Sequence, residues 1–293
     1  MIEYGRFTNV QGNYIDFNDL DVPFNEFTTD VDWRFTEKNK SQEHGIYPGN
    51  SYLGKRLFHC SGDLLQNTSA DYWDLRRRFI KAILPKSHLG YDSVGTLSLR
   101  FTGFNEDVMC ECTLDGYPEI PLQALSPSAS KYQVNFKAYD PRLYGQWWIV
   151  DLPYGVTENI GGRTYNKSFD KTYAAGSGGN DVIISNTGDI ETFPIFTIYG
   201  PVTSPKIILF RGDGKTLYFT LNGLTLNAAS DVVVVDVGKK TAVMNGNFNV
   251  YNYAVGSDWW ALEPDLTNIV RYTADTGSVA SHASVQWRNA YMI

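Results

Sequence analysis

The chain has 293 residues, of which 43% are hydrophobic and 19% are charged. That composition is typical of soluble globular proteins, and it excludes a chain that stays disordered for lack of apolar side chains. The formal net charge is -7 and no long basic block is present, so a dedicated nucleic-acid-binding surface is not expected. The length suggests two domains.

Cysteine usage and the N-terminus bear on the compartment in which the chain folds. Cys60, Cys110 and Cys112 are odd in number and too few for a disulfide framework, which predicts reduced thiols and folding in the cytoplasm. The sequence MIEYGRFTNV lacks a basic start followed by an apolar stretch, and no window approaches the ~18 apolar residues of a membrane helix. We therefore expect no secretion and no membrane insertion.

Alternation of apolar and polar residues predicts strands with one buried face through most of the chain. The apolar positions are Val31, Trp33 and Phe35, then Val108, Cys110, Cys112 and Leu114, then Tyr132, Val134, Phe136 and Ala138. The polar stretch from Glu37 to His44 is too hydrophilic to pack, and it predicts the tip of a projecting hairpin or arm.

Residues 71 to 84 break this pattern and predict a long helix. Tyr72, Leu75, Phe79 and Ile83 recur at helical spacing, and Thr68 or Ser69 is placed to cap the first amides. The basic run Arg76, Arg77, Arg78 and Lys81 suggests either nucleic acid or a solvated helix face. We favour the solvated face, because no aromatic stacking platform or second basic run accompanies it.

After Tyr139-Asp140-Pro141 the sequence becomes rich in glycine and polar residues, with loops expected at 161–162 and 174–180. This shift predicts one domain over residues 1–141 and a second over 145–293. Short strands with turns between them predict a sandwich or jelly roll for the second domain. The expected strands are 195–199, 207–210, 216–221, 232–237, 248–251, 259–262 and 284–288.

No catalytic constellation emerges from the sequence, so we expect no enzyme activity, no catalytic residue, no cofactor and no metal. The four histidines are scattered, without the pairing of a zinc helix. Cys110 and Cys112 share an apolar strand face, which favours core packing over metal ligation. The adhesion-like tripeptide Arg211-Gly212-Asp213 runs into Gly214, and Asp-Gly between two apolar runs favours a tight hairpin turn over adhesion.

Several short motifs follow one another in a fixed order in the C-terminal half. They include Asn186, Gly188, Pro194, Gly200, Asp236, Trp259, Trp260, Pro264 and Asn268. In this order the motifs resemble the distal tail proteins of phages with long non-contractile tails. In the N-terminal half, Tyr72 to Arg78 looks like the helix of that family. One departure is Pro264-Asp265 where the family commonly has Pro-Gly, so a turn of positive φ is expected to fall on Asp265.

The resemblance implies a mainly β protein. Its N-terminal belt domain would be a β-sandwich with one helix and a hairpin arm, and its second domain a galectin-like β-sandwich. It implies a hexameric ring at the tail tip, in contact with the major tail tube protein, a tail-associated hub protein and a receptor-binding protein. DNA would be only passing cargo through a central channel, and the protein would reside in the virion.

Two other functions are open. Exposed aromatics such as Trp147, Trp148 or Tyr173 suit a carbohydrate-binding module for host adhesion, although core or interface packing is the preferred interpretation. A tail-associated hydrolase has the least support. Adjacent residues on a strand point to opposite faces, so we expect one of Trp259 and Trp260 to anchor the core and the other to lie outward or beneath a loop.

Overall fold

The computed structural model describes residues 1–39, 46–84, 94–121, 128–154, 181–278 and 281–293. The chain forms two compact units, one of Met1–Gln146 with Tyr291–Ile293 and one of Trp147–Ala290. Both are mainly β, as predicted, and α1 is the one α-helix in the described residues. Of the predicted arm tip, Glu37 to His44, residues 37–39 belong to a paired strand and 40–44 lie outside the described residues. The loops expected at 161–162 and 174–180, and Tyr173, also lie outside the described residues.

In the first unit the strands follow the order β2-β1-β5-β6-β7-β4-β3. Their bounds are β1 Ile2–Thr8, β2 Tyr14–Phe17, β3 Phe24–Asn39, β4 Ile46–Leu65, β5 Gly95–Phe101, β6 Val108–Leu114 and β7 Ala129–Ala138. The β6 strand pairs with β5 along its length and with β7 at its end, and so joins the two halves of the sheet. Apolar side chains from both halves fill one core.

The alternating pattern in β6 and β7 predicted this core correctly. Val108, Cys110 and Cys112 are buried on one face of β6, and Leu114 is partly buried. On β7 the four alternating residues from Tyr132 to Ala138 are all buried.

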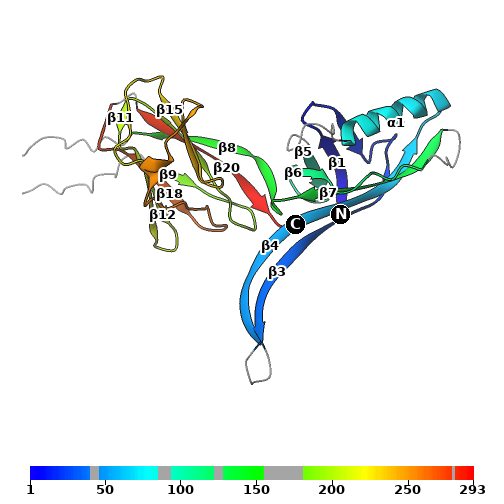
Figure 1. Cartoon of the computed structure of the whole chain (residues 1–293), viewed down its shortest axis with the longest axis horizontal. Helices are drawn as coiled ribbons and strands as arrows, with labels where there is room; N and C mark the ends of the chain where they lie inside the picture. The colour runs from blue at the N-terminus through cyan, green and yellow to red at the C-terminus, as the bar shows by residue number, and fades with distance from the viewer. Residues whose placement is uncertain (40–45, 85–93, 122–127, 155–180, 279–280) are drawn as a thin grey trace, which may run out of the picture. The chain divides into compact units, whose positions relative to one another are not determined.

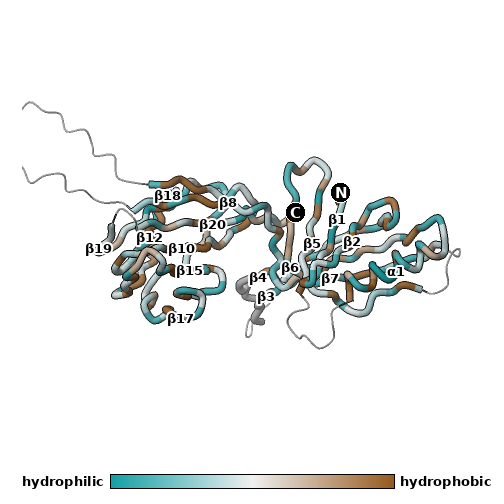
Figure 2. The backbone as a smooth tube through the Cα atoms, turned by 90° about the horizontal axis from the view of Figure 1, so that it is seen from above, coloured by the Kyte–Doolittle hydropathy of each residue, from teal (hydrophilic) through white to brown (hydrophobic). Residues whose placement is uncertain are grey.

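The helix α1 spans Ser69–Ile83, close to the predicted range. Thr68 has extended backbone, and its Oγ1 accepts a hydrogen bond from the Asp71 amide at 3.2 Å, which satisfies one of the unpaired first-turn donors. The apolar positions at helical spacing are buried, whereas Arg77, Arg78 and Lys81 are exposed. Figure 2 shows the resulting alternation of apolar and polar segments along α1. Three of the four basic residues therefore form a solvated helix face, whereas the half-buried Arg76 donates to the Ile120 carbonyl at 2.9 Å.

The hairpin of β3 and β4 continues as a curved two-stranded ribbon beyond the other strands of the first unit (Figure 1). The two strands remain paired as far as Asn39 and Ile46. The prediction of a buried face at Val31, Trp33 and Phe35 is wrong. The Trp33 side chain is 56% exposed and Phe35 is 67% exposed, because no described segment of the unit packs over this part of the ribbon.

The second unit contains two larger sheets that share one apolar core. The first has the order β17-β16-β15-β10-β20-β8, with bounds Phe248–Asn249, Thr241–Met244, Val232–Asp236, Ile195–Tyr199, His282–Tyr291 and Leu143–Pro153. The second has the order β13-β12-β18-β9, with bounds Thr216–Thr220, Lys206–Arg211, Asn268–Thr273 and Val182–Ile184. A small sheet of β14 Thr225–Leu226, β11 Val202–Thr203 and β19 Thr276–Gly277 completes the unit.

Most of the expected strands of this unit are present, with two corrections. The segment 259–262 is not a strand, since its one ladder contact is an isolated bridge between Leu262 and Thr192. The expected strand 248–251 stops at Asn249, and Tyr251–Ala254 forms a short 3-10 helix, η2. Alternation alone did not distinguish a paired strand from an extended segment or a tight helical turn.

Among the described helices, none combines the length and the apolar character needed to cross a membrane.

Candidate functional site

The described residues contain no cluster of three or more histidine, cysteine or acidic side chains placed to hold a metal ion. The three cysteines are free and buried. Burial raises the pKa of the Cys60 thiol to about 12, and the contact with Cys110, followed by burial, raises the pKa of Cys112 well above its ordinary value. These thiols pack as apolar groups and are poor nucleophiles at neutral pH.

A hollow of about 260 Å³ lies on the first unit, on the face of β3, β4 and β7 that points away from the core. Three of its polar side chains already have partners: His59 Nδ1 lies 2.7 Å from Asn135 Oδ1, and the Lys137 ammonium lies 3.1 Å from Asp115 Oδ1. No thiol is among the residues that line it.

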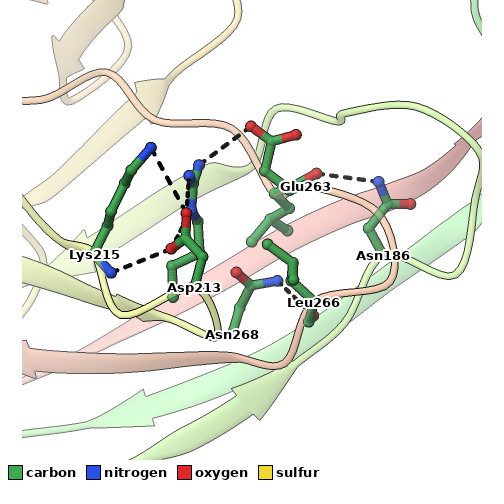
Figure 3. Close-up of polar contacts among 8 residues, drawn as sticks. Asn186, Asp213, Lys215, Glu263, Leu266 and Asn268 are labelled. Atoms are coloured by element: carbon green, nitrogen blue, oxygen red, sulfur yellow. Dashed lines mark hydrogen bonds and ion pairs between the residues drawn. The ribbon is translucent and has the colours of Figure 1, made fainter.

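Asn186, the first of the signature residues, is buried and joins three chain segments of the second unit. Its Nδ2 donates to the carbonyl oxygens of Ile190 at 2.7 Å and, as Figure 3 shows, Leu262 at 3.1 Å. Its Oδ1 accepts from the amides of Gly188 at 3.0 Å and Ala290 at 3.4 Å. A single carboxamide thus forms hydrogen bonds with four backbone groups from these segments.

Pro264 and Asp265 lie next to this asparagine. Pro264 forms a parallel bridge with Asn186, and the Asp265 amide donates to the Asn186 carbonyl at 3.3 Å. Asp265 has φ of 56°, so the positive φ expected where the family commonly has glycine is present on the aspartate. The turn is therefore retained without glycine, since aspartate tolerates the left-handed region better than most residues.

The remaining signature residues also contact the backbone of their own unit. The buried Asn268 donates to the Leu266 carbonyl at 3.0 Å (Figure 3), and Asp236 Oδ1 accepts from the Lys239 amide at 2.9 Å. Pro194 accepts from the Val237 amide at 3.2 Å, and the Gly200 amide donates to Asp231 at 3.0 Å. The structure brings Asn186, Gly188 and Pro264 together, whereas the others lie elsewhere in the second unit.

The adhesion-like tripeptide is a hairpin turn. The Arg211 amide donates to the Lys215 carbonyl at 2.9 Å, and Gly214 takes the positive φ of 87° that the turn requires. The Arg211 side chain is 12% exposed and pairs with Asp213 and Glu263 (Figure 3). Because its guanidinium is held by carboxylates of its own unit, the tripeptide is not displayed to a receptor.

Trp259 and Trp260 divide as expected, although they lie on an extended segment and not on a strand. Trp260 is 3% exposed, with its ring 5.1 Å from that of Phe196. Trp259 is partly buried between Phe219, at 5.0 Å, and Tyr251, at 5.8 Å. Both rings are covered by side chains of their own unit, so neither is a free platform for a sugar.

The exposed apolar surface of the hairpin is the clearest candidate for an interaction site in the first unit. Trp33 and Phe35 stack with ring centroids 6.4 Å apart and planes 17° from parallel, and Leu53 lies opposite Trp33. We name Trp33, Phe35 and Leu53 the arm face. The sequence pattern identified these apolar positions but not their exposure. An isolated two-stranded ribbon is marginally stable in water, and such a face gains stability when a partner covers it.

A model of a known protein family matches most of the second unit. Residues 187–291 match the family model described as the C-terminal domain of siphovirus-type tail components. No curated protein matches the chain.

Two solved structures share the fold over nearly the whole chain. The crystal structure of the Dit protein of phage SPP1, described as a paradigm of the hub adsorption apparatus in phages that infect Gram-positive bacteria, has 13% identity and a TM-score of 0.58. That match covers 92% of this chain and 93% of the other. The baseplate of phage P2 in its activated conformation with Ca has 12% identity, a TM-score of 0.54 and 98% coverage of both chains.

Proposed function

We propose that this chain, which belongs to the siphovirus-type tail components through its C-terminal domain at residues 187–291, assembles into a hexameric ring at the distal end of a long non-contractile phage tail. The chain is a structural component of a phage tail tip. In the proposed ring each copy contacts two neighbours, and a central channel is left for DNA.

The observation that carries this proposal is the arm face. A closed ring with cyclic symmetry needs one patch on each copy that meets a different patch on the next copy. Aromatic residues are enriched at the centres of such interfaces, and Trp33 and Phe35 are stacked, exposed and uncovered by the described residues of their own unit. We propose that the arm face packs against the neighbouring copy.

The two domains take different places in this proposal. The first domain, predicted at 1–141, forms the belt of the ring and also includes the C-terminal residues Tyr291–Ile293. The second, predicted at 145–293 but ending before those residues, forms a galectin-like domain that faces outward. The ring contacts the major tail tube protein, the tail-associated hub protein and the receptor-binding protein, after synthesis in the host cytoplasm. The nine signature residues, from Asn186 to Asn268, support the fold of the outer domain rather than a ligand, in line with their contacts to backbone. The proposed role is geometric and non-enzymatic.

Light scattering coupled to size-exclusion chromatography tests the ring on the full chain. The wild-type protein is expected to run as a hexamer at micromolar concentration, and the double variant Trp33→Ser/Phe35→Ser as a folded monomer with the circular dichroism spectrum of the wild type. Its melting temperature is expected to be lower, because the stability gained on assembly is lost. Tyr117→Ser is the matched control, because Tyr117 is 80% exposed elsewhere in the same unit. A monomeric wild-type protein, or a double variant that assembles like the wild type, would refute the proposal.

A further inference from the structure

Residues 245–256 of the second unit contain no charged residue and include several exposed side chains, and we name them the neutral segment. Its sequence is NGNFNVYNYAVG, and no acidic or basic residue occurs between Thr241 and Ser257. Four large side chains are exposed, namely Phe248 at 66%, Tyr251 at 42%, Tyr253 at 41% and Val255 at 68%. So many exposed apolar groups on one short segment are typical of a binding surface.

This surface is held in place by the core beneath it. Val250 and Ala254 are buried and anchor η2, and one face of the Tyr251 ring stacks on Trp259 with planes 15° from parallel. The Tyr253 carbonyl accepts from the Asn222 amide at 2.8 Å. The rings are thus ordered before any ligand arrives, which lowers the entropic cost of binding.

Asparagine amides alternate with these rings. Asn247 and Asn252 are exposed, and their carboxamides make no hydrogen bond within the part of the chain that the structure describes. Each amide provides two donors and an acceptor. The segment thus provides rings that can stack on a ligand and amides that can pair with hydroxyl groups, and it contains no charged residue. This combination matches the chemistry of a polyhydroxylated neutral ligand.

We propose that the neutral segment binds an uncharged carbohydrate, with Tyr251 and Tyr253 stacking on sugar rings and Asn247 and Asn252 pairing with hydroxyl groups. An anionic glycan would be expected to require a cationic side chain, which the segment lacks.

The tryptophans that the sequence suggested for sugar binding fit this chemistry less well. Trp147 is 52% exposed and Trp148 is 46% exposed. The Arg288 guanidinium lies 4.6 Å from the centre of the Trp147 ring, so this ring lies beside a positive charge, unlike the rings of the neutral segment. The inference on the neutral segment does not depend on ring assembly.

The test is binding of the full chain to an array of neutral glycans built from glucose, galactose, mannose, rhamnose and N-acetylhexosamines, with polygalacturonate as the anionic comparison. The wild-type protein is expected to bind at least one neutral glycan. Tyr253→Ala and Tyr251→Ala are each expected to weaken that binding about tenfold or more, as at other aromatic hot spots. Tyr251→Phe keeps the ring and is expected to retain binding.

Tyr117→Ala is the control, since it removes an exposed tyrosine of the other unit and is expected to leave affinity unchanged. Melting temperatures of all variants show whether Tyr251→Ala disturbs the fold, and Tyr253→Ala provides the test if it does. Three results overturn the proposal: no neutral glycan retained, equal affinity of wild type and Tyr253→Ala, or preference for polygalacturonate. A Tyr253→Ala variant that loses assembly while the wild type binds no glycan would instead identify a protein interface.

Discussion

Gly188 lies so close to Ala290 that a Cβ atom at position 188 would stand 1.9 Å from the Ala290 carbonyl oxygen. The Asp189 amide donates to that same oxygen at 2.8 Å. Asn186 accepts from the amides of both Gly188 and Ala290. The glycine is therefore required by space, since any side chain would push apart two segments that a buried hydrogen-bond network joins.

Gly188→Ala is expected to destabilise the second unit by ~3 kcal/mol, at the upper end for overpacked sites, because the clash is with backbone that no rotamer change relieves. Urea denaturation followed by tryptophan fluorescence measures the change. Thr187→Ala is the control, because Thr187 is the exposed neighbour of Gly188, and it is expected to change stability by less than ~0.5 kcal/mol. Equal, small effects of the two substitutions would show that the contact is looser than described.

The two adjacent tryptophans are expected to differ in their contribution to stability. Trp260→Ala removes a ring that is 3% exposed and is expected to cost ~3 to 5 kcal/mol. Trp259→Ala removes a partly buried ring and should cost less, ~1 to 2 kcal/mol, mainly through its contacts with Phe219 and Tyr251. Thermal melting of both variants tests this, and an equal loss for the two would contradict the assignment.

The sequence pattern predicts which residues share an apolar strand face, but it does not predict which segment packs on that face. Val108 and Trp33 both lie in alternating patterns, yet Val108 is buried and Trp33 is 56% exposed. Alternation indicates which side chains share a face of a strand. It contains no information on whether a second layer, or a second molecule, packs on that face.

Caps and turns were predicted correctly, because they depend on residues that are neighbours in the sequence. The Thr68 cap and the turn at Asp213-Gly214 follow from short-range rules, and both are present. The partners of Asn186 could not be predicted, because they lie up to 104 positions away in the chain. The position of Trp259 beneath Tyr251 likewise depends on tertiary packing.

Thr68→Ala is expected to lower stability by ~1 kcal/mol through loss of the cap of α1. The physical reason is that the Asp71 amide loses the Oγ1 acceptor at 3.2 Å. Thr68→Ser keeps the hydroxyl and is expected to retain most of the stability. Chemical denaturation of both variants makes the comparison, and an alanine variant as stable as the serine variant would show that the cap contributes nothing.

Alkaline pH is expected to destabilise the first unit through Cys60. Burial raises its pKa from the ordinary 9.0 to about 12, so the folded state holds the proton more tightly than the unfolded state. The protonated Cys60 thiol makes its full contribution to the free energy of unfolding below pH 9.0. That contribution is lost as pH rises toward 12, by up to about 1.4 kcal/mol per pH unit. Melting temperature recorded from pH 7 to 11 is expected to fall most steeply above 9.0.

Cys60→Ala is the matched variant for this pH series, and its alkaline decline is expected to be shallower. It should not be flat, because the pKa values of Cys112 and Tyr132 in the same unit are also raised. A variant whose pH profile is parallel to that of the wild type would exclude Cys60 as a source of the alkaline sensitivity.

The return of Tyr291–Ile293 to the first unit makes the second unit an insertion between Gln146 and Tyr291. The buried Arg56 guanidinium secures that return, with one nitrogen 2.8 Å from the Ile293 carbonyl oxygen and another 2.7 Å from that of Pro141. The inserted unit begins on β8 and ends on β20, which are neighbours in one sheet. Replacement of the whole insert therefore needs only two junctions, which lie on neighbouring strands, and it leaves the closing residues of the first unit in place.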